Sequence, residues 1–295
     1  MVRNAALILA LILAPLAARA ELRPYRMVHD GIPRSYHLYV PDRLARFPGP
    51  RPLVLVLHGG GGSAREVRYS TRGRFDDLAE AHGFLVLYPD ALGRIWDTGS
   101  GEISARLDPR RDDAGFLKAA IAAIETDHRI DRDRVFATGV SRGGMESYAL
   151  ACGTLGLIRA IAPVAMTPPE ASAAACATGA PLGFLLIHGT ADPFVPHAGG
   201  PINLGRRDRD RVLSADATMA VFNRRNHCVG AVGEIVGKVR HLDGTGCAAP
   251  TGFYSVGGGW HGWPGGRKVI PGGRAGPVNT DISAPEEIWA FFSRF

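Results

Sequence analysis

A serine flanked by glycines marks the first place where this sequence could do chemistry. Gly139-Val140-Ser141-Arg142-Gly143 follows the apolar run Arg134–Thr138 and precedes a segment of helical character. A Gly-x-Ser-x-Gly turn between a strand and a helix is so tight that the positions two before and two after the serine have little room for side chains. The helix N-terminus also favours negative charge. The pattern predicts Ser141 as a nucleophile for acyl transfer.

A run of glycines supplies the second part of such a site. His58-Gly59-Gly60-Gly61-Gly62 comes directly after the buried run Leu53–Leu57. Acyl transfer needs donors aimed at the carbonyl oxygen as it becomes an oxyanion, and glycines let backbone N–H groups approach it. We expect the donors of an oxyanion hole from Gly59, Gly60 and the N–H of Arg142. The simpler interpretation of this run is a flexible turn.

An aspartate and a histidine downstream complete the constellation. Asp192 comes soon after the apolar run Gly183–His188, and His261 lies in a Gly- and Trp-rich loop before the last predicted helix. In the template, the histidine is the general base and the aspartate fixes its tautomer. The competing aspartates are Asp208, Asp210, Asp216 and Asp243, in charged, helical or turn surroundings; the fallback base is His197. This chemistry requires no metal and no cofactor.

The surrounding pattern predicts the elements that must position these residues. Apolar runs predict strands at Ser35–Val40, Leu53–Leu57, Phe84–Tyr88, Arg134–Thr138, Ala160–Met166, Gly183–His188 and Phe253–Val256. Helical spacing predicts Phe75–Ala81, Asp113–Thr126, Ser214–Arg225 and Pro285–Phe292, the last with a capping box from Ser283 and Glu286. This alternation indicates an α/β fold with a mostly parallel central sheet flanked by helices. Ligands of such sheets bind beyond the carboxyl ends of the strands.

The N-terminus has the features of an export signal. Arg3 precedes an apolar run that ends in Ala18-Arg19-Ala20, a small-x-small cleavage pattern. We expect a signal peptide at 1–20, a single catalytic domain at 21–295, and no membrane association after cleavage. The net charge is +6, but Asp208 and Asp210 interrupt the densest basic stretch, 206–211, which argues against nucleic-acid binding.

The four cysteines are even in number, as in a disulfide-bonded exported protein. They allow three connectivities. We favour the sequence-local pairs Cys152–Cys176 and Cys228–Cys247. No Cys-x-x-Cys occurs, so the spacing does not fit a zinc site.

Taken together, the chain resembles the secreted polyhydroxybutyrate depolymerase and feruloyl esterase group of the α/β-hydrolase superfamily. The motifs that carry the resemblance are His58-Gly59-Gly60, Tyr88-Pro89-Asp90, Asp113-Ala-Gly-Phe116, Gly139-Val-Ser-Arg-Gly-Gly-Met145, His188-Gly-Thr-Ala-Asp192, Val195-Pro196-His197-Ala198-Gly199-Gly200 and Trp263-Pro264-Gly265. The resemblance implies a secreted, periplasmic or extracellular, serine ester hydrolase. Its expected substrates are hydroxybutyrate oligomers, feruloyl or acetyl esters, or similar small esters. The group usually has disulfides near the two favoured pairs.

The departures from this group lie close to the expected site. Trp260 separates the glycines from His261, His197 stands where tyrosine is common, and Arg142 follows the nucleophile where a smaller residue is frequent. Trp96, Trp260 and Trp263 could form an aromatic wall for a phenolic or sugar ester, or could only pack the loops. A serine peptidase of the same fold, similar to prolyl oligopeptidase, is the alternative activity, although no segment for its usual propeller or lid domain is found.

Overall fold

The computed structural model describes residues 21–99, 101–108, 110–153, 156–203, 210–268 and 276–295. The expected signal peptide at 1–20 lies outside these residues, as does most of the basic stretch at 206–211. Within the described ranges, no helix is both long and apolar enough to cross a membrane.

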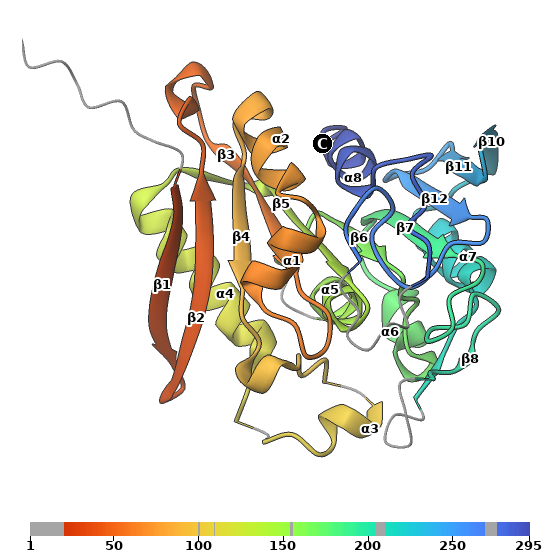
Figure 1. Ribbon diagram of the computed structural model, residues 1–295, viewed down its shortest axis with the longest axis horizontal. Coiled ribbons are helices and arrows are strands. Elements are labelled where there is room, and N and C mark those ends of the chain that lie inside the picture. Colours follow the sequence, from red (N-terminus) through yellow and green to blue (C-terminus); the bar gives the residue numbers. More distant parts are fainter. Residues whose placement is uncertain (1–20, 100, 109, 154–155, 204–209, 269–275) are drawn as a thin grey trace, which may run out of the picture.

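One ten-stranded sheet organises the chain, in the order β1-β2-β4-β3-β5-β6-β7-β12-β11-β10 (Figure 1). Its strands are β1 (Glu21–His29), β2 (Ile32–Val40), β3 (Arg51–Leu57), β4 (Leu85–Pro89), β5 (Ile130–Val140), β6 (Ala160–Val164), β7 (Gly183–Gly189), β10 (Gly230–Val236), β11 (Val239–Thr245) and β12 (Thr251–Val256). The six central strands, from β4 to β12, run parallel. Antiparallel strands close both ends of the sheet. The mostly parallel sheet predicted from the sequence is confirmed.

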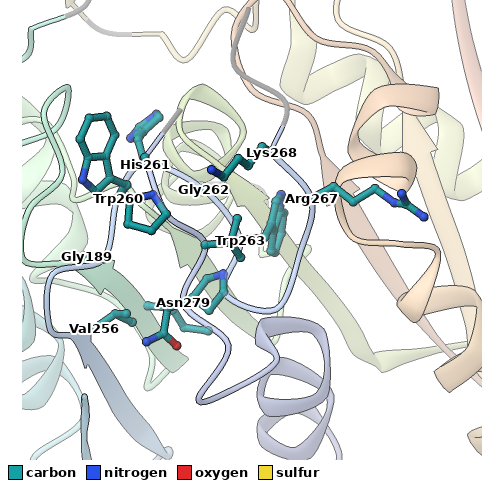
Figure 2. Close-up of a pocket in the computed structure, with 15 residues that line it drawn as sticks. Gly189, Val256, Trp260, His261, Gly262, Trp263, Arg267, Lys268 and Asn279 are labelled. Atoms are coloured by element: carbon teal, nitrogen blue, oxygen red, sulfur yellow. The ribbon is translucent and has the colours of Figure 1, made fainter. Parts of the chain in front are cut away.

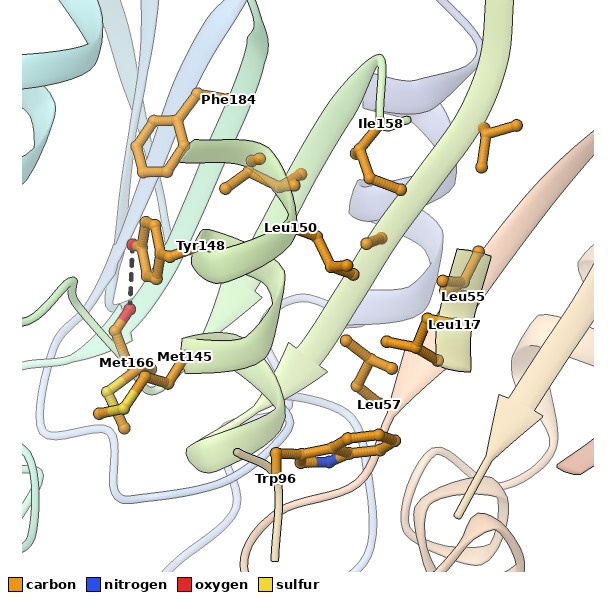
Figure 3. Close-up of a cluster of buried hydrophobic side chains, with 14 of the residues drawn as sticks. Leu55, Leu57, Trp96, Leu117, Met145, Tyr148, Leu150, Ile158, Met166 and Phe184 are labelled. Carbon is orange, nitrogen blue, oxygen red and sulfur yellow. Dashed lines mark hydrogen bonds between the residues drawn. The ribbon is translucent and has the colours of Figure 1, made fainter. Parts of the chain in front are cut away.

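Helices cover both faces of this sheet. The helices are α1 (Ala64–Ser70), α2 (Arg74–His82), α3 (Gly101–Ser104), α4 (Asp113–Asp127), α5 (Arg142–Cys152), α6 (Ala173–Cys176), α7 (Ala215–Arg225) and α8 (Ala284–Phe292). Apolar side chains of α4, α5 and α7 pack in one core cluster, and those of α1, α2 and α8 in a second. Figure 3 shows the first cluster around α5, where Tyr148 donates to the carbonyl of Met166 over 3.3 Å. A small two-stranded sheet, β8 (Gly200–Pro201) and β9 (Arg211–Val212), lies outside the main one.

The seven predicted strands and four predicted helices are all present, with ends that differ by a few residues. The predicted capping box at α8 is wrong in its detail. Ser283 is the N-cap residue, but its hydroxyl donates to the Glu286 carboxylate and accepts no backbone N–H. The two side chains therefore satisfy each other and leave the first turn of the helix without a side-chain cap.

The register of the parallel strands brings their carboxyl ends to one edge of the sheet. Val140 of β5 pairs with Val164 of β6, and Val164 pairs with Ile187 of β7. Val256, the last residue of β12, pairs with Gly189, the last of β7. The loops that follow these strands therefore start side by side at one edge.

Two disulfides cross-link the chain outside the sheet. Cys152 at the end of α5 bonds to Cys176 at the end of α6, and Cys228 bonds to Cys247. These are the two sequence-local pairs. They close loops of 24 and 19 residues, and each stabilises the fold by about 3 kcal/mol in the chain-entropy account.

Candidate active site

Ser141 occupies a strained turn between β5 and α5. Its backbone angles are φ 56° and ψ −123°, a conformation that residues other than glycine rarely adopt. Its N–H donates to the carbonyl of Val164 on the neighbouring strand over 2.9 Å. This hydrogen bond holds the backbone of the turn, which places Ser141 at the N-terminus of α5.

The glycines around Ser141 are required by the closeness of the backbones. A Cβ on Gly139 would lie 2.5 Å from the carbonyl carbon of Gly143. A Cβ on Gly143 would lie 2.3 Å from the carbonyl oxygen of Leu57, the last residue of β3. Both contacts are closer than real Cβ atoms allow, so the crowding inferred from the motif is found in the structure.

The glycine loop after β3 lies against this turn. A Cβ built on Gly59 would be 3.6 Å from the Cβ of Ser141, and one built on Gly60 would be 3.8 Å from the Cβ of Arg142. Side chains of any size here would fill the space beside the serine. The N–H groups at the start of α5 have no acceptor inside the helix, so the loop and the helix end together can present donors to one point.

Buried side chains hold the glycine loop in place. His58 accepts from the N–H of Ala91 through Nε2 over 3.0 Å, and its Nδ1 lies 2.7 Å from the carbonyl oxygen of Gly59. Burial lowers the pKa of His58, which keeps the ring neutral. These contacts make His58 a structural residue rather than a second base.

Arg142 connects the serine turn to the same loop through Trp96. The Arg142 Nε donates to the carbonyl of Trp96 over 2.9 Å, and its Nη2 donates to the hydroxyl of Ser104 over 3.2 Å. The indole N–H of Trp96 in turn donates to the carbonyl of His58 over 2.9 Å. Arg142, the large residue that follows the serine, therefore links the start of α5 to the glycine loop through Trp96.

Asp192 and His261 form a close pair at the neighbouring strand ends. His261 Nδ1 lies 2.7 Å from Asp192 Oδ2, and the other carboxylate oxygen accepts from the N–H groups of Phe194 and Val195 over 2.9 and 3.0 Å. Burial alone would raise the pKa of Asp192, but the hydrogen bond and charge of His261 and these two N–H groups lower it. The carboxylate is thus anionic, fixed and aimed at the imidazole.

The loop that carries His261 is held against the end of β7. Ala191 N–H donates to the carbonyl of Gly259 over 3.0 Å, and Gly258 N–H donates to the Thr190 hydroxyl over 2.9 Å. A Cβ on Gly189 would lie 2.3 Å from the same Gly259 carbonyl oxygen. Close backbone packing, which only glycine permits, therefore brings His261 to Asp192 although 69 residues separate them.

The other histidines near this edge have different partners. His197, the fallback base, places Nε2 3.3 Å from the hydroxyl of Ser255. His188 lies beneath the site, where burial foremost lowers its pKa to about 4. Its Nδ1 lies 3.1 Å from the carbonyl oxygen of Gly189. The geometry thus pairs Asp192 with His261 rather than with either of these rings.

The expected aromatic wall is wrong for two of its three tryptophans. Trp96 is completely buried in the core cluster with Leu57 and Leu117 (Figure 3), and Trp263 is 2% exposed. Neither presents a ring face to a ligand. Trp260 is partly exposed beside His261 (Figure 2) and packs on Gly276, where a Cβ would lie 1.9 Å from its ring. The sequence contains no signal that separates these three roles.

A fully buried carboxyl group on α5 was not anticipated from the sequence. Glu146 has no hydrogen-bond partner for either side-chain oxygen among the described residues. Burial, followed by the charges of Asp113 and Asp97, raises its pKa well above the usual value, and the charges of Arg142 and Arg34 only partly oppose this. Burial without a hydrogen-bond partner therefore favours the protonated form of Glu146 and destabilises the fold.

Replacing Glu146 by methionine is expected to stabilise the protein by about 1–3 kcal/mol at pH 8, the usual cost of an unsatisfied buried polar group. Above the pKa that Glu146 has in the unfolded chain, the folded state keeps a proton that the unfolded state releases. The stability of the wild type therefore falls as pH rises, and the stability gained by Glu146→Met is larger at pH 8 than at pH 5. Urea unfolding at both pH values measures it.

The control for this substitution is Glu170→Met, which removes an exposed carboxylate and is expected to change stability by less than about 0.5 kcal/mol. A loss of stability in Glu146→Met at pH 8 would show that the carboxyl group makes favourable contacts, and a gain independent of pH would show that its pKa is not raised by folding.

Comparison with known proteins places this chain and its fold in a class. Residues 34–165 match the family model of the esterase PHB depolymerases. The chain is 31% identical to the "putative esterase NocK" of Nocardia uniformis over 285 residues, which is 91% of this chain and 82% of that protein. It is 29% identical to feruloyl esterase C of Emericella nidulans over 268 residues, 88% of this chain and 83% of the relative.

Solved structures agree on the fold. An acetyl xylan esterase from Aspergillus awamori superposes with a TM-score of 0.59 at 14% identity, over 92% of this chain and 99% of its own. A thermostable esterase gives a TM-score of 0.54 at 15% identity, over 82% of this chain and 57% of that one. The protein has the α/β-hydrolase fold, and the relatives and solved structures named above are carboxylic ester hydrolases. This chain belongs to the esterase PHB depolymerase family.

Proposed function

We propose that the protein is a serine esterase in which Ser141 is the nucleophile, His261 the general base and Asp192 the acid that orients it. The contact between His261 Nδ1 and Asp192 Oδ2 carries the proposal. Asp192 is anionic and accepts from Nδ1–H, so the imidazole keeps its free electron pair on Nε2, the atom that must take the serine proton.

The proposed roles give the following reaction. His261 takes the proton of Ser141 as the hydroxyl oxygen attacks the ester carbonyl, and the imidazolium returns that proton to the leaving alcohol. The backbone N–H groups of Gly59, Gly60 and Arg142 are the proposed donors to the oxyanion, supported by the N-terminus of α5. Water, deprotonated by His261, releases the acid and restores the serine. The mechanism assigns no step to a cofactor or metal.

The substrates we propose are feruloyl or acetyl esters, hydroxybutyrate oligomers, or similar small esters. The family match and the feruloyl esterase relative support this range. We further propose that residues 1–20 are an export signal and 21–295 the mature catalytic domain, which acts in the periplasm or outside the cell. The two disulfides support an oxidising compartment. Trp260 is the one tryptophan of the three that we retain as a substrate contact.

A panel of esters tests the proposal. The panel contains short- and long-chain nitrophenyl esters, methyl ferulate, an acetylated sugar and hydroxybutyrate oligomers, offered to purified protein that begins at Glu21. We expect rapid hydrolysis of at least one class, and the preferred class identifies the acyl and alcohol parts. Turnover of none of these esters would contradict the proposed function.

A further inference from the structure

A basic groove runs from the His261 loop across the surface to α1. It has a volume of about 570 Å³ and is lined by Tyr69, Arg72, Gly266, Arg267, Lys268, Pro277, Val278 and Thr280. Arg267, Lys268, Pro277 and Val278 also line a cavity of about 40 Å³ that His261 and Trp263 border. Because these four residues line both, the groove adjoins the cavity beside the proposed base; Figure 2 shows that cavity.

Three cations of this groove have no carboxylate partner among the described residues. Arg72 Nε donates only to the carbonyls of Gly265 and Gly266, which anchors the groove floor. The Arg267 guanidinium stands 4.7 Å over the ring of Tyr69, a tyrosine that is 57% exposed. Lys268 is exposed. Since no internal acid neutralises them, these side chains favour an anion from outside.

The cavity beside His261 adds a further donor. Trp263 is buried, and its indole N–H has no acceptor among the described residues. In Figure 2 the Lys268 side chain extends to the His261 side of its loop segment, whereas the Arg267 side chain extends to the opposite side, where it stands over Tyr69 of α1. Asp281, which accepts from Asn279 Nδ2 at the rim, already accepts the N–H of Lys238. The Trp263 N–H, the Lys268 ammonium and the Arg267 guanidinium are donors, as a carboxylate requires.

We propose that this groove binds a carboxylate carried by the alcohol part of the ester substrate. The inference rests on the proposed function, because His261 protonates the leaving alcohol and the groove begins beside His261. An alcohol with a free carboxylate, such as a hydroxy acid or an acidic sugar, would extend from the ester oxygen along the loop toward Lys268. Arg267, farther along the groove over Tyr69, adds a second positive charge.

The test compares two acetate esters that differ in one group, para-acetoxybenzoate and para-acetoxybenzamide. The acyl part is the same, and only the first carries a charge on its alcohol part. In the wild type we expect kcat/KM to favour the carboxylate ester. In Arg267→Gln/Lys268→Gln, the ratio of the two kcat/KM values should fall about tenfold, through KM rather than kcat. Raised salt should reduce the wild-type preference.

The control is Lys118→Gln/Arg224→Gln, which also removes one lysine and one arginine charge, but from exposed positions on α4 and α7. An unchanged ratio of the two kcat/KM values in the groove variant, or an equal fall in the control, overturns the proposed carboxylate site. A second pair, mono-para-nitrophenyl glutarate and para-nitrophenyl pentanoate, carries the charge on the acyl part. If the groove variant changes only that ratio, the assignment to the alcohol part is wrong. If the wild type cleaves neither these esters nor any ester of the panel above, the proposed esterase function itself fails, and the groove with it.

Discussion

Ser141→Ala is expected to lower kcat for any ester substrate by about 10⁶-fold, because no other group can form the acyl-enzyme. What remains is the slow hydrolysis that the oxyanion donors alone support. Alanine removes only the hydroxyl, and the turn is held by backbone contacts: the residue's N–H to Val164 and the close packing of Gly139 and Gly143. The loss should therefore appear in kcat with no loss of folding. Steady-state hydrolysis of a nitrophenyl ester measures it.

Ser147→Ala is the matched control for this prediction. Ser147 lies in the same helix and donates to the carbonyl of Gly143 over 3.1 Å. It has no place in the proposed chemistry, so its variant should keep activity close to the wild type. If Ser141→Ala retained a tenth of the wild-type rate, the nucleophile would have to be another residue.

Asp192→Asn is expected to lower kcat by about 10⁴-fold. The amide keeps a carbonyl oxygen for the N–H groups of Phe194 and Val195, so the turn after β7 should persist. However, the neutral amide no longer stabilises an imidazolium at His261, and its NH₂ group favours the tautomer with the proton on Nε2. That tautomer cannot accept the serine proton.

The control for this second variant is Asp216→Asn, in the first turn of α7, which should leave kcat within about twofold because replacing an exposed aspartate outside the proposed triad changes little. A pH–rate profile adds a separate test. If the loss in Asp192→Asn were only a misfolded loop, raising the pH would not restore activity, whereas a tautomer defect permits partial recovery by hydroxide. A rate near the wild type at all pH values would remove Asp192 from the mechanism.

Much of the fold was predictable because its central strands are buried on both faces. β3, β4 and β7 have almost no exposed residue, and such strands read as continuous apolar runs. The outer strands lack this signal. β10 is exposed along its whole length and contains two glycines. In β1, which contains Pro24, apolar and polar residues do not alternate regularly along the sequence. The short helix α1 was missed because seven residues are too few to establish a helical period.

Part of the candidate site was likewise predictable from the sequence, and part was not. Ser141, Asp192 and His261 follow strands whose carboxyl ends can be placed from the sequence, so their positions at one edge of the sheet could be anticipated. The brace formed by Arg142 and Trp96 depends on where a loop between β4 and α4 returns, and no pattern in the sequence fixes that. Glu146 occupies a helix position whose burial depends on packing against α4 and the loop that contains Asp97. Both features need the tertiary structure.

Covalent labelling tests the central claim most directly. A fluorophosphonate reacts with a serine only when a base activates it, and digestion with trypsin should give the peptide 135–142, in which Ser141 is the only serine. We predict one phosphonate per chain, on that peptide, with labelling greatly slowed in His261→Ala. A label on another serine, or equal labelling of the His261→Ala variant, would contradict the assignment of Ser141 and His261.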